Sequence, residues 1–262
     1  MIKKKLNDKV VIVCTDSDTS RILYHALCLD YNVDKVVFED KISILKKIKS
    51  RYNKLGLMKV IGQLLFQIVV HPFLKYSSKR NLAEIIEKNK LNINHIPTDK
   101  ILRVKSINSN ESRFVLEALN PALIIVNGTR IINTKTLNCV SIPFVNTHVG
   151  ITPRYRGVHG GYWSMVDNGG KYFGVTVHLV DKGVDTGSIL GQTIFKPSSS
   201  DSFVTYPYLQ MIYALKIHKK IIPEILNHNY TVLPSLCDLE SKQWYHPTFL
   251  EYLLNRIFKG VK

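Results

Sequence analysis

Three polar side chains in the middle of the chain have types and spacing suited to acyl-transfer chemistry. Asn146 and His148 lie two residues apart in the stretch FVNTHVG, and Asp185 follows in the turn VDTG. Because side chains alternate along a strand, Asn146 and His148 should share one face. An amide beside an imidazole can stabilise a negative oxygen while a proton moves, and a carboxylate can orient the imidazole or receive its proton. A lone histidine at a strand end is more often structural, so the catalytic prediction depends on Asp185.

Alternating strands and helices must position these side chains. Apolar runs at 9–14, 34–39, 121–128, 144–150 and 173–181 predict strands, and helices are predicted between them, over 202–226 and in the tail. This order predicts an α/β fold, with a Rossmann-like, twisted, mostly parallel sheet and helices on both faces. Ligands bind beyond the carboxyl ends of strands in such sheets. We therefore expect the loops after Cys14, Gly128, His148 and Asp181 to meet.

The length of 262 residues suits a single α/β unit with additions. We expect a catalytic domain over 1–200, with a basic helical insert at about 41–75, and a helical extension over 201–262 packed on the core. Within the insert, 55–74 is apolar except for a stripe of Lys59, Gln63, Gln67 and His71. This spacing favours a mostly buried helix; a membrane-surface helix is the alternative, and no span is expected.

The net charge and the cysteine pattern indicate which binding partners and which cellular compartment to expect. The 36 Lys and Arg residues against 20 Asp and Glu give a net charge of +16, which favours anionic partners, although the cations are spread along the chain and compositional bias explains them equally well. The four cysteines are widely spaced without a CxxC pair, so we predict no metal, no disulfide and a reducing compartment. MIKKKLNDK leads into a strand rather than a signal sequence, so we expect a cytoplasmic protein.

The first predicted strand-to-helix turn, CTDSDTSR, contains no glycine. A dinucleotide fingerprint needs glycines so that a pyrophosphate can approach the backbone, so NAD(P) and FAD are not expected. Thr15, Ser17 and Ser20 could contact an anion, but capping of the following helix is the favoured role.

The stretch NTHVGITPRYRG, followed by GVTVHLVDKGVDTGSIL, resembles the folate-dependent formyltransferase family over about 121–195. The resemblance implies transfer of a formyl group from N10-formyltetrahydrofolate to a primary amine on a Rossmann-like fold. It implies that Asn146 and His148 stabilise the oxyanion and that Asp185 assists proton removal.

The same resemblance implies where the folate lies. NGTRII resembles the family segment whose backbone holds the pterin, which implicates Arg130, Ile131 and Ile132. The 181–187 loop, with Asp181 and Val184, should line the other side of that pocket.

The family includes glycinamide ribonucleotide, methionyl-tRNA and sugar-nucleotide enzymes. The first of these binds a ribose phosphate through a glycine-rich turn that TDSDTS replaces here, and the second carries a barrel domain that the last sixty or so helical residues cannot form. This favours a nucleotide-linked amino sugar used for surface glycan such as lipopolysaccharide O-antigen. Side chains suited to bind its diphosphate and base are Arg154, Tyr155, Arg156, Tyr162 and Trp163, with His178 as a site neighbour. Packing is the alternative for Tyr162 and Trp163.

The expected partners are therefore folate and a nucleotide sugar, with no nucleic acid. The apolar tail FLEYLLNRIF would suit a homodimer contact. Two alternatives remain: a phosphoribosylglycinamide- or methionyl-tRNA-type formyltransferase, and a non-catalytic membrane- or RNA-associated protein on the same fold.

Overall fold

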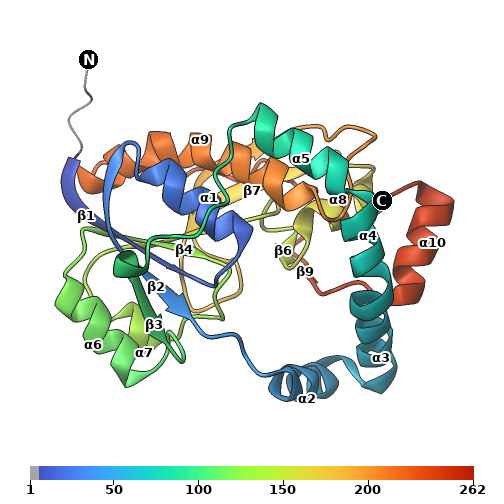
Figure 1. The fold of residues 1–262 in the computed structure, drawn as a ribbon, viewed down its shortest axis with the longest axis horizontal. Helices are drawn as coiled ribbons and strands as arrows, with labels where there is room; N and C mark the ends of the chain where they lie inside the picture. The colour runs from blue at the N-terminus through green and yellow to red at the C-terminus, as the bar shows by residue number, and fades with distance from the viewer. Residues whose placement is uncertain (1–5) are drawn as a thin grey trace.

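A seven-stranded sheet is the centre of the computed structural model, which describes residues 6–262 (Figure 1). The strand order is β3-β2-β1-β4-β5-β7-β8. The parallel strands are β1 (Leu6–Cys14), β2 (Tyr31–Glu39), β3 (Ile101–Val104), β4 (Leu123–Asn127) and β5 (Phe144–His148). β7 (Gly174–Leu179) and β8 (Ile189–Ile194) complete the sheet in antiparallel pairing. The predicted mostly parallel sheet is confirmed.

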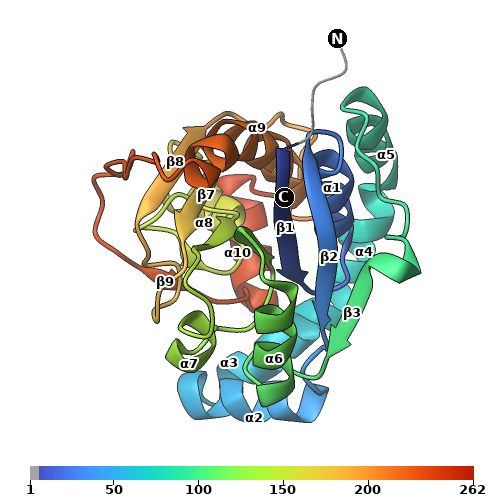
Figure 2. The same ribbon diagram turned by 90° about the vertical axis from the view of Figure 1, so that its left-hand side faces the viewer.

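Helices cover both faces of the sheet, as the continuous apolar strands require. α1 (Asp18–Leu27), α5 (Lys79–Lys88) and α9 (Tyr206–Leu226) pack on one face; α6 (Asn110–Leu119) and α7 (Thr134–Leu137) pack on the other (Figures 1 and 2). Alternate residues of β1 enter the two cores: Val10 and Ile12 face α1 and α9, whereas Val11 and Val13 face α6. The chain extends outward from β1 to β2 and β3, then returns to β4, so a topological switch lies between β1 and β4.

The C-terminal segment predicted to pack on the core also supplies part of that core. Met211, Ala214 and Ile222 of α9 are buried in the same cluster as the β1 side chains. Farther along, β9 (Gln243–Trp244) pairs with β6 (Arg156–Gly157), and α10 (Phe249–Lys259) follows. Outside the helical insert, the remaining elements are α8 (Gly160–Asn168) and the short η2 (Thr98–Lys100).

The helical insert consists of α2 (Ile44–Leu55), α3 (Leu57–Leu65), the π-turn η1 (Phe66–Val70) and α4 (His71–Ser77). Pro72 does not break the insert: it lies in the first turn of α4, and helix continues from Leu57 to Ser77. Proline lacks an N–H and its ring crowds the carbonyl four residues earlier. The wider π-turn directly before Pro72 accommodates both features.

The expectation that this helix is mostly buried is wrong. Only 22% of the most apolar 18-residue stretch of Leu57–Ser77 is buried inside the protein. By length and composition alone, this helix could cross a membrane. Three residues of the polar stripe are turned at least partly toward the protein: Gln63 is buried and Gln67 and His71 are half-buried, whereas Lys59 is exposed. Gln63 is buried and donates from Nε2 to the His246 carbonyl at 2.8 Å, and the ring of His71 packs edge-on against Phe203.

A buried histidine beneath β5 makes stability sensitive to acid. His218 of α9 is fully buried, with Nε2 2.7 Å from Thr147 Oγ1, and burial lowers its pKa to about 4. An unfolded histidine titrates near pH 6.5, so the unfolded chain binds a proton first as pH falls. The contribution of neutral His218 is therefore complete above about pH 6.5 and is lost as pH falls toward 4.

We expect urea unfolding to show a free energy of unfolding about 2 kcal/mol lower at pH 5.0 than at pH 7.5 on account of His218. His218→Gln should have a correspondingly smaller pH dependence, because it carries no titratable ring. An identical pH dependence in both proteins would contradict this assignment.

Candidate active site

The register of β5 and β7 brings the first two predicted catalytic residues beside a third polar group. Asn146 and His148 end β5 on one face of the sheet. The antiparallel pairing sets Asn146 opposite His178 and His148 opposite Thr176. The Nε2 atom of His178 consequently lies 3.2 Å from Asn146 Nδ2, while its Nδ1 lies 2.7 Å from the Leu179 carbonyl.

Asp185 closes this group from the turn after β7. It adopts a left-handed conformation, with φ of 51°, which aspartate tolerates better than most residues. Its Oδ2 lies 3.3 Å from His148 Nδ1 and accepts the Gly157 N–H at 2.8 Å. Its Oδ1 accepts from Asn146 Nδ2 at 3.3 Å and lies 3.6 Å from His178 Nε2. The structure thus brings together Asn146, His148 and Asp185.

The surroundings favour a charged pair within this group. Burial raises the pKa of Asp185, but the neighbouring His148, His178 and Gly157 N–H outweigh it, so the pKa lies well below its usual range. His148 is 4% exposed, and its Nε2 lies 2.6 Å from the Tyr155 carbonyl oxygen. Both ring nitrogens of His148 therefore face acceptors. Only the doubly protonated ring donates to both, so the geometry favours an imidazolium beside the Asp185 carboxylate.

The loop between β5 and α8 supplies backbone groups that the sequence did not single out. The Tyr155 carbonyl holds His148, and the Gly157 N–H holds Asp185. Arg156 donates from Nη1 to the Val184 carbonyl at 3.0 Å and so ties this loop to the Asp185 turn. The residues PRYRG identified the loop as basic, but residue types do not predict which backbone groups form contacts.

Most of the side chains predicted to bind substrate are used in packing. Arg154 pairs with Asp167 at 2.9 Å, and the fully buried Tyr155 donates its hydroxyl to the same carboxylate at 3.1 Å. Tyr162 and Trp163 are 1% and 7% exposed and pack in an aromatic cluster beneath the loop. The packing alternative is the one that the structure shows for these two, and of the five predicted side chains Arg156 has the clearest link to the Asp185 turn.

The predicted folate segments are also partly occupied by internal contacts. The Arg130 N–H donates to Glu39 at 2.9 Å, its guanidinium pairs with the same buried carboxylate at 2.6 Å, and the Ile131 carbonyl accepts from Asn108 at 2.9 Å. Ile132 is buried. Asp181 accepts from the Gly183 N–H and the Thr186 hydroxyl, which shapes its own turn. The side chains of Ile131, 53% exposed, and the half-buried Val184 are left as apolar surface.

The glycine-free first turn is organised around helix capping. Ser17 accepts a hydrogen bond from the Ser20 N–H and caps α1, as predicted. Arg21 pairs with Asp16 at 2.9 Å and with Asp18 at 3.6 Å. Two carboxylates at this turn disfavour a phosphate there.

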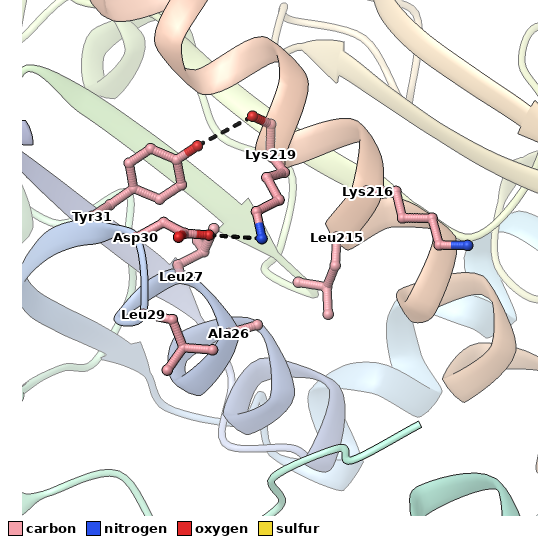
Figure 3. Close-up of a pocket in the computed structure, with 8 residues that line it drawn as sticks. All are labelled: Ala26, Leu27, Leu29, Asp30, Tyr31, Leu215, Lys216 and Lys219. Atoms are coloured by element: carbon pink, nitrogen blue, oxygen red, sulfur yellow. Dashed lines mark hydrogen bonds and ion pairs between the residues drawn. The ribbon is translucent and has the colours of Figure 1, made fainter. Parts of the chain in front are cut away.

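A separate pocket of about 220 Å³ lies between α1 and α9 (Figure 3). Within it Lys219 Nζ lies 3.0 Å from the Asp30 carboxylate, and the Tyr31 hydroxyl donates to the Lys219 carbonyl at 3.3 Å. Tyr31 begins β2, whereas His148 ends the parallel strand β5, so this pocket is at the opposite end of the sheet. Among residues 6–262, no group of three or more His, Cys, Asp or Glu side chains could hold a metal.

Comparisons with known proteins identify the family of this chain. The model of the formyl transferase family matches residues 58–206, more than half of the chain. The chain therefore belongs to the formyl transferase family.

Individual relatives are more distant. A methionyl-tRNA formyltransferase of Caldanaerobacter subterraneus is 36% identical over 93 residues, which cover 35% of this chain and only 30% of the relative's length. The structure of a sugar N-formyltransferase from a Shewanella species is 15% identical and covers 90% of this chain and 76% of that one, with a TM-score of 0.56. A glycinamide ribonucleotide transformylase of Symbiobacterium toebii is 14% identical, with coverage of 88% and 99% and the same TM-score. At these identities the structural likeness shows the fold alone.

Proposed function

We propose that the protein transfers a formyl group from N10-formyltetrahydrofolate to the primary amine of a nucleotide-linked amino sugar. The observation that carries formyl transfer is the contact of His148 and Asn146 with one buried carboxylate, Asp185, in a chain of the formyl transferase family. The donor supplies an activated one-carbon unit, and Ile131 and Val184 offer apolar surface for its ring system.

The polar side chains have complementary tasks in this reaction. The amine nitrogen forms a bond to the formyl carbon, the bond from that carbon to N10 of the donor breaks, the amine loses a proton and N10 gains one. The positive charge of His148 and the Asn146 amide stabilise the oxygen that becomes negative. Asp185 keeps His148 charged and accepts the proton of the attacking amine, directly or through water. The low pKa of Asp185 keeps this carboxylate ionised at neutral pH.

Two observations support a nucleotide sugar as the acceptor. The first turn holds Asp16 and Asp18 where a glycinamide ribonucleotide enzyme would need a phosphate cradle. Arg156 is the cation best placed to meet a diphosphate, because it lies beside the Asp185 turn. A formylated nucleotide sugar would be used in surface glycan synthesis. We propose that the protein acts in the cytoplasm.

Methionyl-tRNA is the second candidate acceptor. The net charge of +16 and the local sequence likeness to methionyl-tRNA formyltransferases favour it. The stretch after α9 contains β9 and α10 rather than the strands of a barrel.

An acceptor panel tests the proposal. The purified protein is incubated with N10-formyltetrahydrofolate and, separately, with amino sugars linked to UDP or dTDP, glycinamide ribonucleotide and methionyl-tRNA. We expect release of tetrahydrofolate and a formyl amide, identified by mass, with at least one sugar nucleotide. Formylation of methionyl-tRNA alone would replace the sugar proposal by the second candidate. Turnover with none of these acceptors would contradict formyl transfer to these amines.

A further inference from the structure

The helix Leu57–Ser77 leaves most of its apolar side chains exposed, unlike a core helix. Val60, Gln63, Phe66 and Leu74 are its buried residues, and they fix it along the body of the protein. Phe66 contacts the rings of Phe203 and Tyr252, 5.1 and 5.3 Å between centroids. Most of the remaining apolar side chains are exposed, whereas Leu64 and Val70 are half-buried.

The outward side chains form an extended apolar surface. Met58, Ile68 and Phe73 are 81%, 70% and 62% exposed. α10 contacts α3 and η1, and Gly62 allows α3 to approach Thr248 at the start of α10 (Figure 1). We name the exposed apolar residues of these two helices the outer apolar surface: Leu57, Met58, Ile61, Leu65, Ile68, Val69, Phe73, Tyr76, Leu250, Leu253, Leu254, Ile257 and Phe258. Exposed apolar surface of this extent marks an interaction site.

Cations are concentrated in the same insert. Between positions 41 and 83 the sequence has no Asp or Glu. It has ten Lys and Arg residues in that range: Lys41, Lys46, Lys47, Lys49, Arg51, Lys54, Lys59, Lys75, Lys79 and Arg80. All except the half-buried Arg51 are exposed. Both views show α2, which carries five of these cations, joined to α3 at the lower edge of the molecule (Figures 1 and 2).

Charge complementarity indicates which kind of partner binds the outer apolar surface. A second copy of the chain would bring the same ten cations against each other, which opposes a symmetric contact. A membrane-spanning role conflicts with the buried side of the helix, because Gln63 and Phe66 are packed against the protein. Apolar side chains flanked by Lys and Arg, on a helix held along the body of the protein, match a surface that lies on anionic lipid.

We propose that the outer apolar surface and the cations of α2 dock the protein on an anionic membrane surface. The apolar side chains enter the boundary between headgroups and acyl chains, and the lysines contact lipid phosphates. This binding does not depend on formyl transfer. It would hold the His159 loop near the bilayer, because His159 contacts His246 at 2.8 Å and His246 accepts from Gln63 of α3.

Vesicle sedimentation with the full chain tests the proposal. We expect the protein to pellet with vesicles of phosphatidylcholine and phosphatidylglycerol, to remain in solution with phosphatidylcholine alone, and to bind less at high salt. Ile68→Asp combined with Phe73→Asp should weaken binding at least about tenfold, because two inserted side chains become charged. Lys46→Gln combined with Lys47→Gln should weaken it about 25-fold, at about fivefold for each charge.

Matched control variants locate the effect. Phe114→Asp changes a phenylalanine 71% exposed on α6, and Lys88→Gln with Lys90→Gln removes two exposed charges at the end of α5. These variants should bind vesicles as the unaltered protein does, and circular dichroism should show all variants folded. The absence of pelleting with anionic vesicles would overturn the proposal, and so would an equal loss of vesicle binding in the control variants. A dimer in sedimentation velocity that Ile68→Asp with Phe73→Asp dissociates would also overturn it. RNA binding that these variants abolish, without vesicle binding, would overturn it as well.

Discussion

Asp185→Asn should lower kcat/KM for formyl transfer roughly 1,000-fold while the protein remains folded. Asparagine keeps the shape of the side chain but removes the charge that faces His148 Nδ1 at 3.3 Å. It also removes the proton acceptor proposed for the attacking amine. The measurement is initial-rate kinetics with the acceptor identified in the panel, together with the melting temperature of the variant.

Two histidine variants show whether the loss reflects chemistry or local structure. His148→Gln should approach the Asp185→Asn rate, because it removes the cation that stabilises the oxyanion. His178→Gln should lose less, because His178 contacts Asn146 and Asp185 from the neighbouring strand, with its other nitrogen against the Leu179 carbonyl. Near-normal kcat/KM for Asp185→Asn, or a larger loss for His178→Gln than for His148→Gln, would contradict the proposed roles.

Gly150→Ala should reduce both stability and activity. A Cβ atom at this position would lie 2.5 Å from the Tyr155 carbonyl oxygen and 2.8 Å from His148 Nε2. These two atoms form the hydrogen bond that holds the imidazole. The backbone at Gly150 must therefore move away from the Tyr155 carbonyl, which disturbs the contact that fixes the ring. We expect the free energy of unfolding to fall by about 3 kcal/mol and kcat/KM to fall about 100-fold.

Gly260→Ala is the matched control for that substitution. Nothing lies within 4 Å of a Cβ at Gly260, although its φ of 64° disfavours alanine. It should therefore cost only about 1 kcal/mol, with unchanged kcat/KM. Urea unfolding and initial rates measure both variants. If Gly150→Ala were no worse than Gly260→Ala, the close approach at the loop would not matter for the site.

The sequence predicted the parallel sheet and the shared face of Asn146 and His148 because both depend on local patterns, whereas Asp185, far away in the sequence, was placed with them by the family resemblance. Apolar runs of β-branched residues mark strands buried on both faces, and a polar residue two positions from another shares its face. Sequence also identified the capping role of Ser17. These features need only a few neighbouring residues, so a single sequence contains them.

The missed features depend on contacts between distant segments. Apolar spacing suggested that 55–74 is buried, but spacing states how residues divide around a helix and not which side faces the protein. Here Gln63 donates to the carbonyl of His246, which lies 183 positions away, so the side of the helix that carries Gln63 faces the protein. Likewise, the residue types of Arg154 and Tyr155 suit a diphosphate and a base. In the structure, however, both side chains bind the Asp167 carboxylate.

The pairing of β6 with β9 has a consequence for the order of folding. The Gly157 N–H that holds Asp185 lies in a strand whose partner, Gln243–Trp244, is near the end of the chain. The Arg156 N–H donates to the Lys242 carbonyl, and the Val158 N–H donates to the Trp244 carbonyl. During synthesis the sheet and its three side chains emerge well before these residues, and such long-range pairing forms late. The nascent protein should therefore carry its catalytic side chains before it has a finished active site.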